Sequence, residues 1–428
     1  MKKQRWLVLA HCFNMDGQAA SHHITDKIPY LIKRGIEPVV VTAATGYPDT
    51  KVEHHQVTSL APSGLRFELR HIINNKVKFK LLAQLLKGIS SIGLFPLYIV
   101  EKIFIHLDSQ WSWFQSAEMK GAQLMRANSF DMIYVSGGAS SAFLAAHRLS
   151  KRFDVPWIAE IYDPMVNDAW GRSRMAYRWN LWLESIICNN ARAAFWFTKE
   201  ALIQARNRNP RLSNRGHLMR PGMIPPNFGQ VTYERGEKLR LSYFGGLTPE
   251  RNLKLLCNAL GRLFAARANL KEKIEVHVYG GKMDVLSQEA FRQLPKTVLK
   301  AHGRLEYDES TGKSGRQRVL EAMRQSDALV LMHGLGDICK LYLPSKIYEY
   351  LWAQRPVLVF SPVPDHWAEI LDPSIHFVVQ QSDATEVDAA LEKLINLWEN
   401  DELPDLSVNQ AYSVEQAVEQ LVSAAQVR

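Results

Sequence analysis

Short apolar runs alternate with helical patterns along the whole chain of 428 residues. Each run has the length of a strand buried on both faces, and the segments between runs carry apolar residues at every third or fourth position, as helices packed on one side do. This alternation predicts parallel sheets covered by helices, the α/β class. We expect strands over residues 5–10, 37–43, 130–138, 155–163, 239–246, 273–281, 327–334 and 356–360.

A segment rich in proline and glycine divides this pattern into two series. Residues 219–230, MRPGMIPPNFGQ, hold three prolines and two glycines, which is typical of an interdomain linker. The alternation of strands and helices restarts after it. We therefore predict one Rossmann-like domain over residues 1–222, a second over 223–408, and a terminal amphipathic helix within 409–428.

Residues 66–113 do not fit a plain Rossmann domain and form a helical insertion. A helical stripe of leucine and isoleucine is followed by a strongly apolar piece, with basic residues beside it. Such an arrangement suits an interfacial membrane helix, in which cations meet lipid phosphates while apolar side chains enter the headgroup boundary. The expected membrane contacts are Lys78, Lys80 and Lys87. A helical hairpin packed on its own domain is the alternative.

Composition limits the other classes of protein. The hydrophobic content of 46% is ample for packed cores, and the length fits two or three domains. Four cysteines lie far apart without metal-ligand spacing, which argues against a zinc site or disulfides and favours a reducing compartment. A run of only five apolar residues precedes His11, fewer than a signal peptide needs, and no run of about 18 apolar residues predicts a membrane span.

The net charge of +9 is unevenly distributed. Residues 1–220 hold 29 Lys and Arg against 16 Asp and Glu, whereas residues 221–428 hold 23 against 27. A basic first half indicates that this half meets an anionic surface, either nucleic acid or anionic lipid. A nucleic-acid binder is disfavoured, because no element interleaves basic residues with surface aromatics.

Three strands of the second half end in small and basic residues. The stretch YFGGLTPERN ends its strand at Gly245 and Gly246, and we expect Pro249 to start the next helix with Arg251 near its amino end. Glycines let a ligand approach the backbone, and free N–H groups beside an arginine suit a diphosphate. A similar strand end at Gly280 belongs to YGGK. A plain turn before a helix would give the same pattern.

Another strand end leads into LYLPSKIYEYLWAQRPVLVF, residues 341–360. Ser345 is placed to cap a helix there, and Lys346 and Glu349 lie three residues apart in its first turns. A cation in the first turn is disfavoured by the helix dipole unless an anion lies nearby, which favours phosphate binding. An exposed salt bridge between the two side chains is the alternative.

Common catalytic signatures are missing from the sequence. It contains no GxSxG, no GxxxxGK[ST] and no GxGxxG opening the first helix. Hydrolase, P-loop kinase and dinucleotide-binding interpretations therefore lack support.

These motifs resemble the GT-B glycosyltransferases, especially the retaining family 4, or group 1, enzymes of bacterial polysaccharide synthesis. LPSKIYEYLWAQRPVLVF is similar to their nucleotide-sugar motif PSKxxEYxAxGKPV, and YFGGLTPERNLKLL to a donor loop of the form VGRLxPEKGxxxL. Residues 130–164 resemble the acceptor domain of the bacterial polysaccharide branch. The likeness runs over nearly all of the chain. It implies two Rossmann-like domains facing across a cleft, with the terminal helix crossing back to the first.

The resemblance also implies roles for particular residues. Glu349 matches the glutamate that binds the donor ribose, Arg251 matches the basic residue on the diphosphate, and Lys346 is a second phosphate contact. Gly17 matches the loop that closes over the phosphates. The implied donor-binding set is Gly17, Gly245, Gly246, Arg251, Gly280, Ser345, Lys346 and Glu349. No metal is expected, since this class works without one.

Departures from the family pattern affect the catalytic residues. Leu341 stands where family 4 usually has a second glutamate that contacts the transferred sugar, and Gly246 replaces the arginine of the donor loop. Tyr162 and Met165 replace the arginine and tryptophan of the ExRDPW element. The candidates for the catalytic base are Asp163 and Asp16.

The expected function is a glycosyltransferase that moves a sugar from a UDP-, GDP- or ADP-sugar to a hydroxyl of a lipid-linked or glycan acceptor. The resemblance implies retention of configuration and a role in cell-surface polysaccharide synthesis, as exopolysaccharide or lipopolysaccharide. It places the protein in the cytoplasm, peripherally on the inner face of the cytoplasmic membrane, without nucleic acid. A catalytically silent GT-B partner or scaffold protein and a GT-B nucleotide-sugar epimerase are the alternatives.

Overall fold

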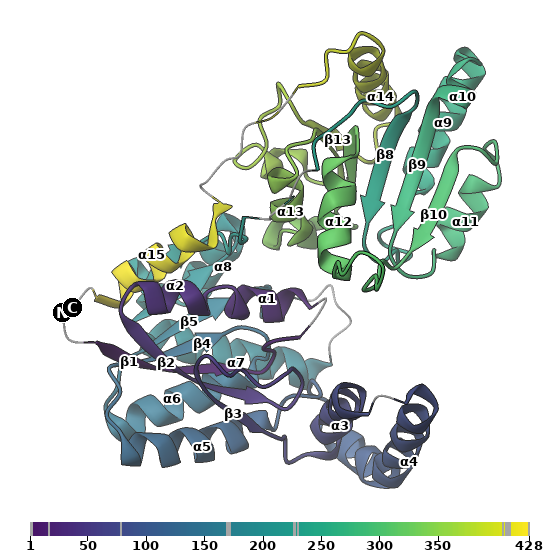
Figure 1. The fold of residues 1–428 in the computed structure, drawn as a ribbon. Coiled ribbons are helices and arrows are strands. Elements are labelled where there is room, and N and C mark those ends of the chain that lie inside the picture. The colour runs from purple at the N-terminus through teal and green to yellow at the C-terminus, as the bar shows by residue number, and fades with distance from the viewer. Residues whose placement is uncertain are drawn as a thin grey trace. The chain divides into compact units, whose positions relative to one another are not determined.

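The chain divides into two compact units, each with its own sheet (Figure 1). The computed structural model describes residues 3–15, 18–77, 79–167, 173–225, 228, 231–404, 406 and 412–426. Unit 1 comprises Met1–Ile224 and Ala411–Arg428, and unit 2 comprises Pro225–Gln410. The α/β class predicted from the alternating pattern is confirmed.

The sheet of unit 1 has seven parallel strands in the order β3-β2-β1-β4-β5-β6-β7. The order reverses between β1 and β4, so the connections from these neighbouring strands leave in opposite directions. The strands are β1 (Gln4–Ala10), β2 (Ile36–Ala43), β3 (Glu53–Val57), β4 (Met132–Ser136), β5 (Trp157–Ile161), β6 (Ala193–Trp196) and β7 (Gly216–Leu218).

Helices cover both faces of this sheet. One face packs against α1, α2 and α15 in a continuous apolar core, so the last helix of the chain belongs to unit 1. On the other side, α6 packs between α5 and α7. The helices are α1 (Ala19–Thr25), α2 (Ile28–Lys33), α3 (Pro62–Lys76), α4 (Lys80–Phe104), α5 (Trp113–Ala127), α6 (Ser141–Phe153), α7 (Arg174–Asn190), α8 (Lys199–Arg208) and α15 (Val414–Gln426), with a 3₁₀ segment at Pro210–Arg215.

A buried ion pair lies where α1 ends and α2 begins. The sequence pattern indicates one helix here, but the chain breaks at Lys27, just before a proline in the first turn of α2. The Lys27 Nζ donates to Glu160 Oε1 at 2.6 Å and to the His23 carbonyl at 2.7 Å. Both charged side chains are fully buried, and Glu160 also accepts from the Tyr134 hydroxyl. The break thus places a cation against the end of β5.

The sheet of unit 2 has six parallel strands in the order β10-β9-β8-β11-β12-β13. Its order reverses between β8 and β11, as the order in unit 1 does between β1 and β4. The strands are β8 (Leu239–Phe244), β9 (Ile274–Tyr279), β10 (Leu299–Gly303), β11 (Ala328–Met332), β12 (Val357–Ser361) and β13 (Phe377–Gln380).

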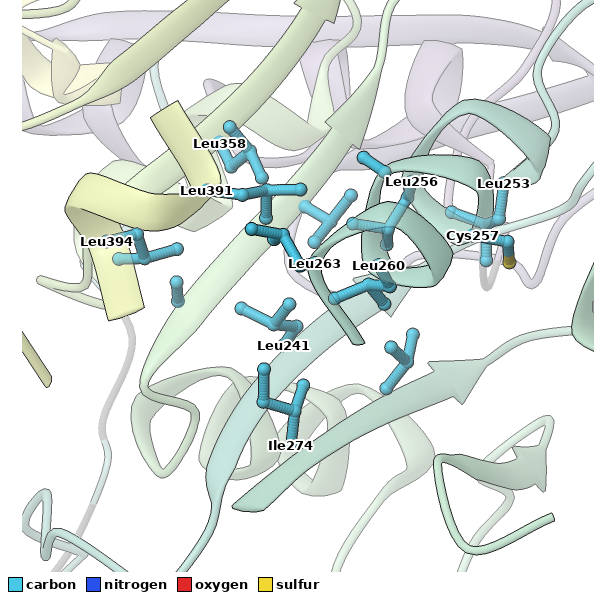
Figure 2. Close-up of a cluster of buried hydrophobic side chains, with 14 of the residues drawn as sticks. Leu241, Leu253, Leu256, Cys257, Leu260, Leu263, Ile274, Leu358, Leu391 and Leu394 are labelled. Atoms are coloured by element: carbon cyan, nitrogen blue, oxygen red, sulfur yellow. The ribbon is translucent and has the colours of Figure 1, made fainter. Parts of the chain in front are cut away.

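The core of unit 2 lies between the sheet and α9 with α14 (Figure 2). Leu256, Leu260 and Leu263 recur along α9 at helical spacing and pack with Leu391 and Leu394 of α14. The helices of this unit are α9 (Lys254–Ala266), α10 (Leu270–Lys273), α11 (Val285–Phe291), α12 (Gly315–Arg324), α13 (Lys346–Trp352) and α14 (Ala384–Glu399), with 3₁₀ segments at Asp337–Leu341 and Pro364–Trp367.

The predicted insertion is a pair of helices, α3 and α4, at one end of unit 1 (Figure 1). We call residues Pro62–Phe104 the α3–α4 hairpin. Among the residues that the structure describes, no single helix is long and apolar enough to cross a membrane. Two parts of α4, Leu81–Gly93 and Phe95–Phe104, meet that length and composition only together, with a bend of 48° between them.

Candidate active site

The point where the strand order of unit 2 reverses gathers the residues singled out from the sequence. In open α/β sheets, ligands bind beyond the carboxyl ends of the strands at such a point. The loop after β8 carries Gly245 and Arg251, and the loop after β11 leads into α13 with Lys346 and Glu349. Because β8 and β11 are hydrogen-bonded neighbours, these two loops share one edge of the sheet.

The loops after β8 and β9 touch through their backbones, and this contact requires glycine. Gly280 has a φ of +157°, and a Cβ there would lie 2.0 Å from the Gly245 carbonyl oxygen. Gly245 itself has a φ of +128°, and its N–H donates to the Tyr279 carbonyl at 2.8 Å. The two predicted glycines therefore allow the ends of β8 and β9 to approach closely, and no side chain at either position covers the backbone beside the site.

Lys346 and Glu349 form an ion pair in this structure. The Lys346 Nζ lies 3.3 Å from Glu349 Oε2, and the two side chains are 32% and 22% exposed. Lys346 extends over the β8 loop, because its Cε would lie 3.8 Å from a Cβ on Gly245. The pair is half-buried at the edge of the sheet, and this position leaves both charges within reach of a ligand over the glycine loop.

Arg251 lies in a tight turn and not at the start of a helix. Backbone bonds join Thr248 and Arg251 in both directions, at 3.0 Å and 2.9 Å, and α9 begins only at Lys254. The expectation that Pro249 starts the helix is therefore wrong, because the reciprocal bonds close a turn over these residues. Arg251 is exposed and its Cγ would lie 3.9 Å from a Cβ on Gly334, in the loop after β11.

Tyr350 holds α13 in place across the reversal point. Its hydroxyl accepts from the Phe244 N–H at 3.2 Å and donates to the Val330 carbonyl at 3.1 Å. One buried side chain thus bonds β8 and β11 together and fixes the helix that carries Lys346 and Glu349. This role of Tyr350 was not predicted from the sequence, although the residue directly follows Glu349 in the motif.

His333, the first residue after β11, is buried and fixes the loop behind Arg251. Its Nε2 lies 3.2 Å from the Tyr342 carbonyl and its Nδ1 lies 3.2 Å from Ser361 Oγ. The carbonyl needs a donor, so Nε2 carries the proton and Nδ1 accepts from the serine. The pKa of His333 is lowered to about 3, mainly by burial and to a smaller extent by the charges of His366 and Arg251.

We expect this neutral histidine to make stability dependent on pH. The unfolded chain takes up a proton near the ordinary pKa of 6.5, and the folded protein does so only near 3, so stability is lost as the pH falls through this window. Between pH 7.5 and 5 the loss from His333 is about 2 kcal/mol. Urea unfolding at the two pH values measures it. The His333→Gln variant, which lacks the titrating group, should show a smaller loss, and an equal loss would contradict this assignment.

Three further residues that the sequence singled out lie in the loops of this edge. Ser345 is the residue before α13, but its side chain makes no capping bond, because its backbone is already helical. Leu341 is buried in a 3₁₀ segment and 8% exposed. Gly246 is exposed, and its carbonyl accepts from the Tyr243 hydroxyl at 3.0 Å.

A cavity of about 390 Å³ adjoins this edge at the ends of β9 and β10. Gly280 and Gly303 form part of its wall, and Lys282 and Arg304 supply two cations. Apolar contacts come from Val278 and Met283. A volume of this size lies in the range of small-ligand sites.

Unit 1 has a smaller cavity of about 150 Å³ at the ends of β4 and β5. The predicted Asp163 lines it together with Asp108, which the sequence analysis did not select as a site residue. Asn180 also lines it, is buried, and has an Oδ1 with no hydrogen-bond partner among the described residues. Gly137 admits the close approach of β5, since a Cβ there would lie 2.4 Å from the Glu160 carbonyl oxygen.

The remaining predicted residues are not described or are placed differently. Asp16, Gly17 and Lys78, and the side chain of Lys80, lie outside the described residues. Lys87 is half-buried, and its Nζ donates to Asn74 Oδ1 of α3 at 2.9 Å. Within the described ranges, no group of three or more His, Cys, Asp or Glu side chains is arranged to hold a metal ion.

Comparisons with known proteins identify the fold. The sequence matches no protein-family model and no curated protein. The structure is similar to TarM at a TM-score of 0.62 and 12% identity, with 99% of each chain covered. It is also similar to HepE from Anabaena, solved with UDP and glucose, at 0.59 and 13%, covering 99% of this chain and all of the other. A trehalose 6-phosphate synthase from Burkholderia multivorans gives 0.61 and 13%, with 99% and 98% covered.

These neighbours have the GT-B fold, and so does this chain. At 10–13% identity the likeness shows the fold alone. Any activity therefore has to be inferred from the side chains at the two sheet edges.

Proposed function

We propose that this protein transfers a sugar from a nucleoside-diphosphate sugar, bound at the reversal point of unit 2, to a hydroxyl of an acceptor bound at unit 1. The observation that carries the proposal is the placement of three charged side chains on the loops of one sheet edge: Lys346 pairs with Glu349 and lies over Gly245, and Arg251 lies over Gly334. Two cations beside a carboxylate match the two chemical parts of a nucleoside diphosphate, the phosphates and the ribose hydroxyls.

The donor would extend along the edge of the sheet. Arg251 and Lys346 would bind the diphosphate together with the backbone at Gly245, and Glu349 would accept hydrogen bonds from the ribose. The base would occupy the cavity of about 390 Å³, next to Lys282 and Arg304. Binding of this kind would break the ion pair between Lys346 and Glu349. Lys346 would then contact the diphosphate, and Glu349 would contact the ribose.

The chemistry requires mainly positioning and charge stabilisation. The bond from the sugar C1 to the diphosphate oxygen breaks, the acceptor oxygen bonds to C1, and the acceptor proton passes to a base or the leaving phosphate. Negative charge grows on the diphosphate, where the two cations stabilise it. The mechanism needs no metal ion, because Arg251 and Lys346 neutralise the leaving group.

We place the acceptor hydroxyl in the cavity of unit 1. Asp163 and Asp108 both line it, and the unpartnered Oδ1 of Asn180 offers an acceptor for a hydroxyl. Asp163 is the candidate base, with Asp16 as the second. We further propose that transfer retains configuration, as in the family 4 enzymes, and that the acceptor is a lipid-linked glycan in cell-surface polysaccharide synthesis.

One observation favours a second function. Leu341 puts a buried apolar side chain where the related enzymes contact the transferred sugar with a glutamate. A protein that binds the nucleotide and transfers nothing, as a partner in an assembly complex, would tolerate this change. The two functions share nucleotide binding and differ only in turnover.

Thermal unfolding with a panel of nucleotides tests the shared step. UDP-sugars come first, since HepE and TarM were solved with UDP, followed by GDP- and ADP-sugars. At least one should raise the midpoint of wild type. The Arg251→Ala variant should lose affinity for the diphosphate about tenfold while keeping affinity for the nucleoside. No response across the panel would rule out the proposal.

A further inference from the structure

An exposed apolar surface covers the α3–α4 hairpin of unit 1. Twelve of the 24 exposed large apolar side chains among the described residues lie between residues 79 and 104. Six of them define what we call the outer face of α4: Leu81, Leu85, Ile89, Ile92, Val100 and Ile103. Leu81 is 83% exposed and Ile92 is 76% exposed. A contiguous exposed apolar surface marks an interaction site, whereas apolar residues scattered singly over a surface do not.

Hydrogen bonds hold one side of α4 against the rest of unit 1, so the outer face points toward solvent. Lys87 bonds to Asn74 of α3, and Glu101 accepts from the Ser63 N–H at 2.7 Å and from Trp111 Nε1 at 2.8 Å. Glu101 is buried. A hairpin that merely packed on its own domain would bury its large apolar side chains, and those of the outer face stay exposed.

The charge around the outer face is of one sign. Residues 62–106 contain seven Lys and Arg and two Glu. Both carboxylates, Glu68 and Glu101, are buried and bonded to Ser59 and Ser63. The hairpin therefore shows no carboxylate at its described surface. A partner that lies against it should be anionic or uncharged.

Aromatic side chains of α4 lie next to two cations of the hairpin. Arg66 lies 4.6 Å from the ring centroid of Tyr98 and 5.9 Å from that of Phe95, and Lys102 Nζ lies 6.0 Å from Tyr98. Aromatic rings next to Lys and Arg are the usual side chains at the boundary between lipid headgroups and acyl chains.

We propose that the outer face of α4 docks unit 1 on an anionic lipid bilayer, lying in the interface and not crossing it. The straight parts of α4 span about 20 Å and 15 Å at 1.5 Å per residue, each shorter than a hydrocarbon core of about 30 Å. The 48° bend lies next to Pro96, and crossing would carry Arg66 and Arg70 of α3 into hydrocarbon. A second copy of this chain fits poorly, because it would bring two cationic rims together.

Vesicle binding by the full chain tests the apolar part of this surface. Wild type should float with vesicles of phosphatidylglycerol and phosphatidylcholine. The Leu85→Asp/Ile92→Asp variant should bind them at least about tenfold more weakly. A matched control, Met119→Asp/Leu335→Asp, changes two exposed apolar residues elsewhere and should bind like wild type. Thermal midpoints of both variants should match wild type, since all four positions are exposed.

A second pair of variants tests the charge. The Arg70→Glu/Lys76→Glu change reverses two exposed cations of the hairpin and should weaken binding to anionic vesicles about tenfold at low salt. The control Lys271→Glu/Lys296→Glu makes the same change of charge in unit 2 and should have little effect. Binding of the hairpin variant to vesicles of pure phosphatidylcholine should equal that of wild type.

Three results would overturn the docking. They are equal binding by the Leu85→Asp/Ile92→Asp variant, self-association that this variant abolishes without vesicle binding, and resistance of bound protein to alkaline carbonate, which indicates a spanning segment. The docking does not depend on the proposed function, because vesicle binding needs no nucleotide. Wild type that responds to a nucleotide but does not bind vesicles overturns the docking alone, and wild type that binds vesicles but responds to no nucleotide overturns only the proposed function.

Discussion

The Glu349→Ala variant is expected to bind its nucleotide sugar about 100-fold more weakly than wild type, as the loss of two hydrogen bonds to a carboxylate predicts. The variant also leaves Lys346 without its partner at 3.3 Å. The freed cation remains available to the diphosphate, so the loss should appear mainly in the ribose contact. Calorimetric titration measures the affinities for the nucleoside diphosphate and for its 2′-deoxy analogue.

The analogue separates a ribose contact from a general loss of charge. If Glu349 binds the ribose, wild type should discriminate between the two nucleotides and Glu349→Ala should not. The control is Glu392→Ala, an exposed glutamate on α14 whose removal should leave both affinities unchanged. Equal affinity of wild type and Glu349→Ala for the nucleotide would contradict the assignment.

The Lys27→Met variant is expected to lose about 3–5 kcal/mol of unfolding free energy, because it leaves the Glu160 carboxylate buried without its cation. Among the described residues, the Glu160 carboxylate accepts from Lys27 Nζ and from the Tyr134 hydroxyl, and of these two partners only Lys27 carries a positive charge. The midpoint of urea unfolding at neutral pH, with an unchanged slope, measures the loss.

A double variant distinguishes an unpaired charge from lost packing. Lys27→Met/Glu160→Gln removes both charges and keeps an acceptor for Tyr134, so it should recover most of the lost stability. If the double variant is as unstable as the single one, the loss comes from packing at the break between α1 and α2. A single variant within about 1 kcal/mol of wild type would show that water already reaches this pair.

The α/β class and the central strands could be predicted from the sequence. β1, β2, β11 and β12 are buried on both faces, so their apolar runs are continuous and easily found. The edge strands β3 and β10, EHHQV and LKAHG, are largely polar and were missed, because an edge strand has one neighbour and an exposed face. The break in the first helix depends on a tertiary ion pair, which no local pattern shows.

The site was predictable only in part. The spacing predicted that Lys346 and Glu349 share a turn, and the structure shows the ion pair between them beside a glycine loop. Phosphate binding by Lys346 stays a prediction. Tyr350 and His333 act through bonds to residues far along the chain, so their roles appear only in the folded structure. The direction of the apolar stripe of α4 likewise follows from its bonds to α3 and Trp111, not from the order of its residues.

The most direct test of the account is transfer itself. The purified protein is incubated with labelled UDP-, GDP- and ADP-sugars and a membrane extract of its source organism, beside Glu349→Ala and Asp163→Asn. The account predicts label in the glycan or lipid-linked fraction with wild type, and about 100-fold less with Glu349→Ala. Nucleotide binding with no label transferred from any donor, or label recovered only as an epimerised nucleotide sugar, would contradict it.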